Sequence, residues 1–158
     1  MSDLTYQRTL PKKRMFAGAL FFDEEGRFLI VQPTYKQDWE IPGGVVELGE
    51  SPREGCNREI QEELGLIHPP ERLLCVDYLH ESSDKTEALG FIFLGGTLTE
   101  LEIAQIRLPA KELQGYRFLP FTEALPYLSS RMQRRLPICL EAMQTGQPFY
   151  LEDQQKRF

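Results

Sequence analysis

Apolar and polar positions in the first third of the chain predict two strands joined by a turn. The apolar runs MFAGALFF and RFLIV flank Asp23-Glu24-Glu25-Gly26, a segment typical of a β-turn. We therefore expect a β-hairpin over residues 14–33. The chain then continues as an irregular stretch through Trp39 and Pro42 to Gly43-Gly44, a pair that lets the backbone approach a neighbour or a ligand closely.

The clearest helix signal begins at Ser51. Ser51 can cap the helix, Pro52 suits its first position, and Glu54 completes a capping box. Gly65 supplies the left-handed residue that ends many helices. The pattern therefore predicts a helix over residues 52–64.

The second half of the chain reads as strands followed by a helical end. Strands are expected near residues 73–80 and 87–94, and a short one at 116–119 precedes a helical region. Ser129 and Ser130 can cap a last helix that reaches about Gln144 and is kinked at Pro137. Because strands outnumber helices, we predict an α/β (α+β) domain with helices packed on a sheet, as one domain over residues 1–158.

Composition narrows the classes of partner and compartment. The longest apolar run near the start is too short to cross a membrane, and no secretory signal is visible, so we expect a cytoplasmic protein without a membrane partner. The widely spaced Cys56, Cys75 and Cys139 are interpreted as reduced core thiols. A net charge of −6 argues against a nucleic acid polymer as partner. If the substrate is an anion, a cation must mediate between it and this acidic chain.

Three glutamates share one sector of the expected helix: Glu59, Glu62 and Glu63. A separate apolar stripe beside them, formed by Cys56, Ile60 and Leu64, is expected to face the core. The simplest interpretation is a solvated acidic face. However, Glu59 and Glu63 repel each other at i,i+4, and Gly55 weakens the same helix. Locally unfavourable residues that converge on one face favour a metal site, and oxygen ligands suit Mg²⁺ or Mn²⁺.

These residues also carry a family resemblance. The pattern Gly44-x5-Glu50-x7-Arg58-Glu59-Ile60-x-Glu62-Glu63-x-Gly65-Leu66 resembles the Nudix box at every defined position. The segment from Trp39 to Gly44 resembles the lead-in of that family. The resemblance implies an α/β/α sandwich around a mixed β-sheet. It also implies a metal-dependent hydrolase that cleaves a phosphoanhydride bond in a nucleoside diphosphate-linked substrate by attack of water at phosphorus.

The resemblance assigns metal binding to the glutamate sector and to the glycine turn. Glu59, Glu62 and Glu63 would hold Mg²⁺ or Mn²⁺ against the diphosphate. The turn at Gly43 and Gly44 would lie beside the ion, where a carbonyl oxygen of Gly44 can join its ligands.

Several roles remain open at this stage. Arg58 would orient Glu59 through a charge-assisted hydrogen bond, or simply pair with Glu62 along the helix. Glu50 would support the loop or take part in catalysis. The general base would be Glu59 or, from outside the box, Glu112, which precedes the strand expected at 116–119. Trp39 and Tyr35 either stack on a base or pack in the protein.

The resemblance specifies the chemistry better than the substrate. The proline typical of ADP-ribose hydrolases and the tyrosine typical of diadenosine polyphosphate hydrolases are both missing from residues 81–84. We therefore expect a small nucleotide-type substrate, such as a nucleoside triphosphate or a nucleotide sugar.

Two other functions remain open. A Nudix-like module that senses a nucleotide without cleaving it would normally lack part of the box. An isopentenyl diphosphate isomerase would need an early cysteine, and the first cysteine here is Cys56. The oligomeric state is undecided, with a homodimer as one option.

Overall fold

The computed structural model describes residues 2–157 and is built on an eight-stranded mixed sheet. The strand order is β6-β2-β1-β5-β4-β7-β8, with β3 paired to β1 outside this path. The strands are β1 (Arg14–Phe22), β2 (Phe28–Pro33), β3 (Gly43–Val45), β4 (Arg72–Leu79), β5 (Ala88–Thr97), β6 (Leu113–Leu119), β7 (Phe149–Glu152) and β8 (Gln155–Lys156). The helices are α1 (Asp3–Thr9), α2 (Pro52–Leu64), α3 (Glu100–Ala104), α4 (Phe121–Ala124) and α5 (Ser130–Thr145), with a 3₁₀ turn η1 (Leu125–Tyr127).

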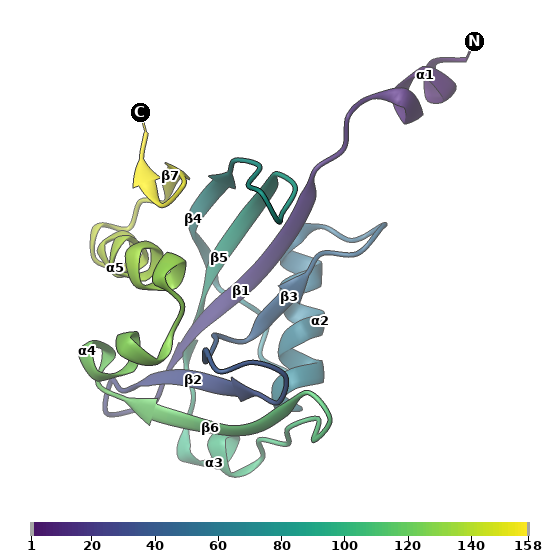
Figure 1. Cartoon of the computed structure of the whole chain (residues 1–158). Coiled ribbons are helices and arrows are strands. Elements are labelled where there is room, and N and C mark those ends of the chain that lie inside the picture. The colour runs from purple at the N-terminus through teal and green to yellow at the C-terminus, as the bar shows by residue number, and fades with distance from the viewer. Residues whose placement is uncertain (1, 158) are drawn as a thin grey trace.

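Helices cover both faces of this sheet, as Figure 1 shows, with α2 on one side and α4 and α5 on the other. One apolar core joins the sheet to α2 through Cys56, Ile60 and Leu64. A second core joins the opposite face to α5 through residues that include Leu136 and Cys139. Parallel pairs (β1 with β5, β4 with β7) occur beside antiparallel pairs. The predicted α/β/α sandwich around a mixed sheet is therefore confirmed.

The hairpin expected over residues 14–33 is only partly present. Both strands and the turn form, but β1 and β2 pair only where Phe22 meets Phe28. Along its other edge β2 pairs with β6. The edge of β1 that faces away from β5 pairs with β3 instead. Ala17 lies opposite Gly44, and Gly18 lies opposite Gly43. The stretch expected to be irregular thus contains a short strand, which fixes the glycine pair against the centre of the sheet.

Helix α2 begins and ends where the sequence predicts. Ser51 and Glu54 form the reciprocal capping box, and Gly65 caps the end with φ 69°. Helix α5 also follows the prediction, with Ser129 as its N-cap and Gly146 as its left-handed C-cap. Pro137 lies inside α5 without ending it, and the kink stays a prediction.

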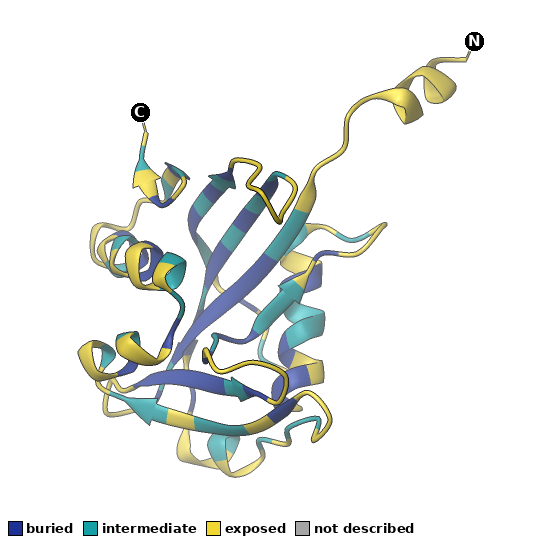
Figure 2. Cartoon of the chain, viewed as in Figure 1, coloured by how far each residue is buried: buried dark blue, intermediate teal, exposed yellow. Residues whose placement is uncertain are grey.

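The two ends of the described chain contain elements that the apolar pattern did not predict. Helix α1 has no buried residue and projects away from the body of the protein (Figure 2). The small antiparallel pair of β7 and β8 extends the sheet beyond β4. Within residues 2–157, no helix is long and apolar enough to span a bilayer.

Candidate active site

The backbone at Gly44 lies directly against the carboxylate of Glu59. A Cβ atom placed on Gly44 would be 2.5 Å from Glu59 Oε1 and 2.7 Å from its Cδ. Such distances are far inside van der Waals contact, so a side chain at residue 44 would displace the carboxylate. A glycine at residue 44 therefore leaves the Glu59 carboxylate in its place beside β3.

Arg58 connects the glutamates at the rim of α2. Its Nε and Nη2 donate to Glu50 Oε2 and Oε1 at 2.9 and 2.8 Å, a bidentate pair. Its Nη1 donates to Glu59 Oε1 at 3.0 Å and to Glu62 Oε2 at 3.2 Å. Its Nη2 also donates to the Val45 carbonyl at 3.0 Å, which ties α2 to β3. The two alternatives for Arg58, orienting Glu59 and pairing with Glu62, occur together in this geometry.

Glu50 is held from two sides. Besides Arg58, the backbone N–H of Glu47 donates to Glu50 Oε1 at 2.8 Å. These hydrogen bonds, Arg58 first and then the Glu47 amide, lower the pKa of Glu50 to about 2. With both oxygens engaged by the loop and the helix, its contacts are those of a residue that supports the loop.

Glu63 is a carboxylate in an apolar position. Its exposed fraction is 8%, and the backbone N–H of Gly43 lies 3.4 Å from its Oε1. Burial first, and the neighbouring Glu59 carboxylate second, raise the pKa of Glu63 to about 9. Burial also raises the pKa of Glu59, against the opposing effect of Arg58. Two half-buried or buried carboxylates side by side are unfavourable unless a proton or a cation lies between them.

This donor set fits a hard divalent cation. Glu59, Glu63 and the backbone of the glycine turn offer only oxygen ligands, as Mg²⁺ and Mn²⁺ prefer. Within residues 2–157, however, no three His, Cys, Asp or Glu side chains already form a metal-ligand arrangement. The third glutamate, Glu62, is more than half exposed and turns toward Arg58. The structure therefore brings the buried Glu63 and the half-buried Glu59 together and leaves Glu62 at the rim.

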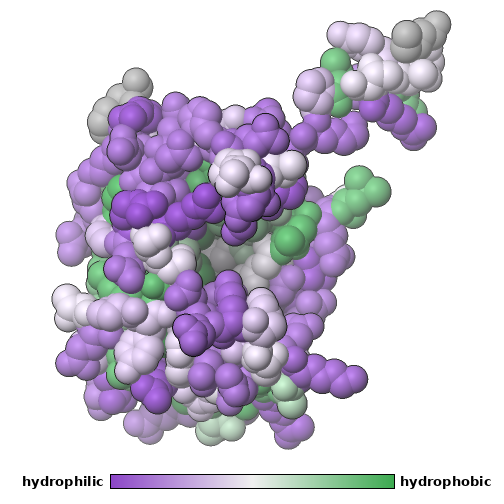
Figure 3. Space-filling model, in the orientation of Figure 1, coloured by the Kyte–Doolittle hydropathy of each residue, from purple (hydrophilic) through white to green (hydrophobic). Residues whose placement is uncertain are grey.

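A cleft of about 690 Å³ opens beside this pair, between α5, β1 and the segment from residue 35 to 45. Figure 3 shows a hollow near the centre of the molecule that is rimmed mainly by hydrophilic side chains. Gly43, Gly44 and Glu63 line one part of the cleft. Glu112 also lines it and lies exposed just before β6, where its carbonyl accepts from Thr34 N at 2.9 Å.

The aromatic side chains of the cleft differ in exposure. Trp39 is 8% exposed and packs edge-to-face with Tyr127 at a centroid distance of 5.6 Å. The Arg117 guanidinium lies 5.1 Å from the Trp39 ring. Tyr35 is 71% exposed and lines the same cleft. The structure thus favours packing for Trp39, whereas Tyr35 is exposed and has the Lys36 ammonium 5.9 Å from its ring centroid.

The sequence patterns did not predict that four cations from separate parts of the chain would line the cleft together. These residues are Arg14, Lys85, Arg131 and Arg135. They come from β1, the β4–β5 loop and α5, which are far apart in the chain. The apolar spacing of α5 places Arg135 near its buried face, and this is the one signal that could have marked it.

Comparisons with known proteins agree with this geometry. The NUDIX domain model matches residues 12–137. A Bacillus subtilis (strain 168) protein, provisionally named ADP-ribose pyrophosphatase YjhB, is 35% identical over 85 residues, which are 52% of this chain and 40% of the relative. The 8-oxo-dGTP diphosphatase of Proteus vulgaris is 31% identical over 94 residues, covering 57% of this chain and 83% of that protein.

Solved structures show the same fold. The crystal structure of a MutT protein from Methanosarcina mazei Go1 superposes with a TM-score of 0.68 at 22% identity, covering 87% of this chain and 99% of that one. The family model covers most of the chain, including the glycine turn, helix α2 and the cleft. The chain therefore belongs to the NUDIX domain family.

Proposed function

We propose that this protein is a metal-dependent hydrolase that cleaves a phosphoanhydride bond in a nucleoside diphosphate-linked substrate. The carrying observation is the buried Glu63 with the half-buried Glu59 beside Gly44, where Glu63 and Gly44 line the cleft. A carboxylate pair in this position is costly without a cation. The relatives named for ADP-ribose and 8-oxo-dGTP support the substrate class, because both compounds are nucleoside diphosphate derivatives.

Glu59, Glu62, Glu63 and the carbonyl of Gly44 would hold Mg²⁺ or Mn²⁺. When bound, the ion supplies a Lewis acid for phosphoryl oxygens and offsets charge between substrate and protein. The chain's own contribution is positioning. Arg58 fixes the Glu59 carboxylate through Nη1, while its bond to the Val45 carbonyl keeps α2 and the glycine turn in register.

The general base is proposed to be Glu112 or Glu59. Glu59 Oε1 already accepts from Arg58 Nη1, so this oxygen is engaged by the helix. Glu112 lines the cleft and is exposed to water. These features favour Glu112 as the residue that removes a proton from the attacking water.

The assignment of the base is tested by Glu112→Gln beside Glu59→Gln. If Glu112 is the base, Glu112→Gln lowers kcat by about 10²-fold or more and leaves metal affinity nearly unchanged. If Glu112→Gln keeps nearly full kcat while Glu59→Gln is inactive, the base lies inside the box.

The proposed substrates are nucleoside triphosphates and nucleotide sugars. A panel of these compounds, with dinucleotides and ADP-ribose, is assayed with Mg²⁺, with Mn²⁺ and in excess EDTA. Hydrolysis in ¹⁸O-water should label a phosphate-containing product, because the site offers carboxylates for a metal but no Ser or Cys nucleophile with an adjacent base. Undiminished turnover in EDTA would contradict the proposal.

Two other functions are distinguished by the same panel. A nucleotide-sensing module would bind one of these compounds and release it unchanged. An isomerase would need a reactive cysteine, but Cys56 is buried in α2 and burial raises the pKa of its thiol to about 12.

Domain extent, compartment and assembly remain predictions. We predict a single domain over residues 1–158, of which the first and last residues lie outside the described part. We also predict a cytoplasmic location. For the assembly, a homodimer is one option.

A further inference from the structure

Charged side chains divide the cleft into two ends. The lining carboxylates are Asp38 and Glu40 before β3, Glu63 of α2 and Glu112 just before β6. Lys36 also lines the cleft and pairs with Glu40. The other lining charges are Arg14 of β1, Lys85 of the β4–β5 loop, and Arg131 and Arg135 of α5. These three elements contribute no carboxylate of the described residues to the lining, and we call their part of the cleft the basic end.

Two arginines of the basic end are anchored. Arg135 has a 3% exposed fraction, and its Nε donates to the fully buried Asp77 at 2.8 Å. Its guanidinium lies 5.3 Å from the ring of Phe16, which also lines the cleft. Arg14 donates through Nε and Nη2 to the hydroxyl and carbonyl of Thr86. Both side chains are thus fixed by contacts that leave a guanidinium at the cleft wall.

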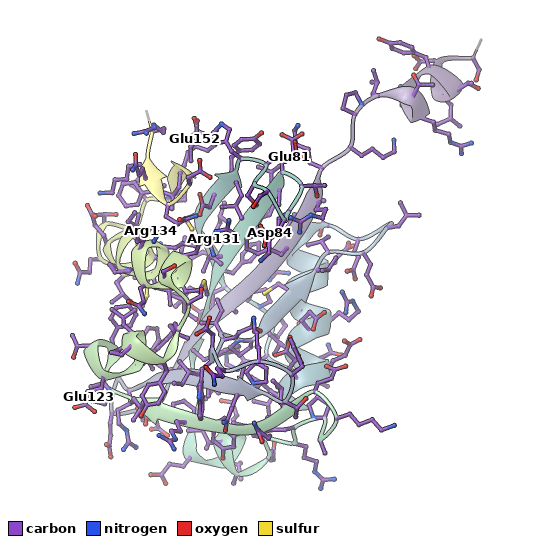
Figure 4. All side chains as sticks on the ribbon, in the orientation of Figure 1. Glu81, Asp84, Glu123, Arg131, Arg134 and Glu152 are labelled. Atoms are coloured by element: carbon purple, nitrogen blue, oxygen red, sulfur yellow. The ribbon has the colours of Figure 1, made fainter. Side chains whose placement is uncertain are left out.

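The side chains of the other two cations are held less firmly. Among the described residues, the side chains of Arg131 and Lys85 form no hydrogen bond or ion pair, although both charges act on the exposed Asp84, whose pKa is lowered first by a hydrogen bond from Ser82 and also by these two cations. Figure 4 shows Arg131 on the side of α5 that faces the β4–β5 loop with Asp84. Asp84 accepts a hydrogen bond from Ser82 and does not line the cleft. The positive charge of the basic end is therefore balanced only in part, by an exposed carboxylate outside the cleft, and the two side chains can turn toward a ligand in the cleft.

The position of Arg131 is locally unfavourable. It is the second residue of α5 after the cap Ser129, and the first turn of this helix contains no acidic residue. A cation at a helix N-terminus meets the positive end of the helix dipole and is disfavoured there. Residues that oppose local stability are typical of functional sites, and an anion bound there would offset the cost.

Resting on the proposed function, we infer that the substrate carries a second anionic group, remote from the diphosphate that is cleaved, and that Arg131 and Lys85 bind it at the basic end. The carboxylate end would receive the diphosphate together with its metal ions. The basic end would receive a phosphate monoester or a carboxylate directly, without a metal. A nucleoside diphosphate derivative with a charged remote group is therefore preferred over its neutral analogue.

The test compares two matched pairs of nucleoside diphosphate-linked compounds. Coenzyme A and dephospho-coenzyme A differ by a phosphate monoester, whereas UDP-glucuronate and UDP-glucose differ by a carboxylate. Dissociation constants are measured by calorimetry for the whole protein in EDTA, and kcat/KM is measured in Mg²⁺. A charge-assisted contact predicts a preference of roughly 10-fold or more for the charged member of at least one pair. The preference should persist in EDTA and fall as salt is raised.

Two variants of the same helix separate site from surface. Arg131→Gln should abolish the preference while binding of the neutral members is kept. Arg134→Gln removes the same charge from a residue that binds Gln154 and does not line the cleft, so it should keep the preference. A preference within one pair alone identifies the remote group as phosphate or as carboxylate.

Equal affinities within both pairs, no binding of any of the four compounds, or a preference that survives in Arg131→Gln would overturn the inference. Failure of the proposed function looks different. In that case the charged members bind more tightly in EDTA, but no compound is hydrolysed in Mg²⁺.

Discussion

Each of the two long helices has an arginine that pairs with a carboxylate from another segment, but the two pairs differ in burial. Arg58 of α2 pairs with Glu50 of the preceding loop at the rim, with side-chain exposed fractions of 24% and 16%. Arg135 of α5 pairs with Asp77 of β4 in the core, with exposed fractions of 4% and 0%. The first pair has partners that face the cleft and the metal ligands. The second joins α5 to β4 and to the C-terminal strands.

The partners of the two arginines explain this difference. Arg58 reaches Glu50, Glu59 and Glu62, so its guanidinium distributes one charge over three carboxylates. Asp77 instead collects donors: Arg135 Nε, the backbone N–H of Gln154 at 3.1 Å and its side-chain Nε2 at 3.2 Å. The rim pair is therefore suited to positioning, whereas the core pair is suited to holding secondary structure together.

The largest expected effect follows from breaking the core pair. Asp77→Ala leaves Arg135 buried without its counter-charge, and the free energy of unfolding should fall by about 3–5 kcal/mol. Urea denaturation followed by circular dichroism measures this loss. Asp84→Ala removes an exposed carboxylate from the nearby β4–β5 loop and should change stability little. If both variants are equally stable, the core pair has no structural role.

Replacing Arg58 at the rim should affect stability less than breaking the core pair does, and should mainly affect activity. Arg58→Gln should lower the free energy of unfolding by at most about 1 kcal/mol, because its partners remain accessible to water. Its kcat should fall by about 10²-fold, since Glu59 loses the donor that fixes its carboxylate. Arg53→Gln is the matched control, because Arg53 lies on the same helix but donates to the Pro70 carbonyl. Equal kcat values for the two variants would remove the positioning role from Arg58.

The same contrast explains what the sequence could predict. The α2 site is local: residues 44–66 contain the cap, the glycine turn, the arginine and all three glutamates. Helical spacing relates Arg58 to Glu62 directly, so the rim contacts follow from the sequence and are seen in the structure. The role of Glu50, loop support or catalysis, could not be decided from the sequence, because the conformation of residues 45–50 depends on pairing between β1 and β3.

The core pair and the basic end could not be predicted in this way. Asp77 and Arg135 are 58 residues apart, and their contact depends on how α5 packs on β4. No local spacing relates Arg14, Lys85 and Arg131 either, since the sheet order and the packing of α5 on β4 bring their elements together. The hairpin over residues 14–33 was overestimated for the same reason. Competition between β2 and β3 for the edge of β1 is a tertiary effect.

The smallest expected effect concerns Glu63, and its sign depends on pH and metal. Burial, followed by the neighbouring Glu59, raises the pKa of Glu63 from 4.5 to about 9 in the native protein. Between these values the native state binds a proton that the unfolded state has released, so stability without metal falls as pH rises through this window. In EDTA near pH 7, Glu63→Gln should be as stable as wild type or more stable, because native wild type must keep a proton on Glu63 that glutamine does not need.

The difference should grow toward pH 9, where wild type must ionise Glu63 beside Glu59, whereas the glutamine variant has no proton to lose. In millimolar Mg²⁺ the difference in stability between the variant and wild type should shrink or reverse, because binding of the ion stabilises wild type more. Thermal melts from pH 5 to 9, with and without metal, measure both parts, and Glu123→Gln on α4 is the exposed control. Activity of Glu63→Gln should fall by orders of magnitude throughout. A metal ligand at an active site lowers local stability in return for function. A Glu63→Gln protein that is clearly destabilised in EDTA yet remains active would show the opposite, and this glutamate would then be structural.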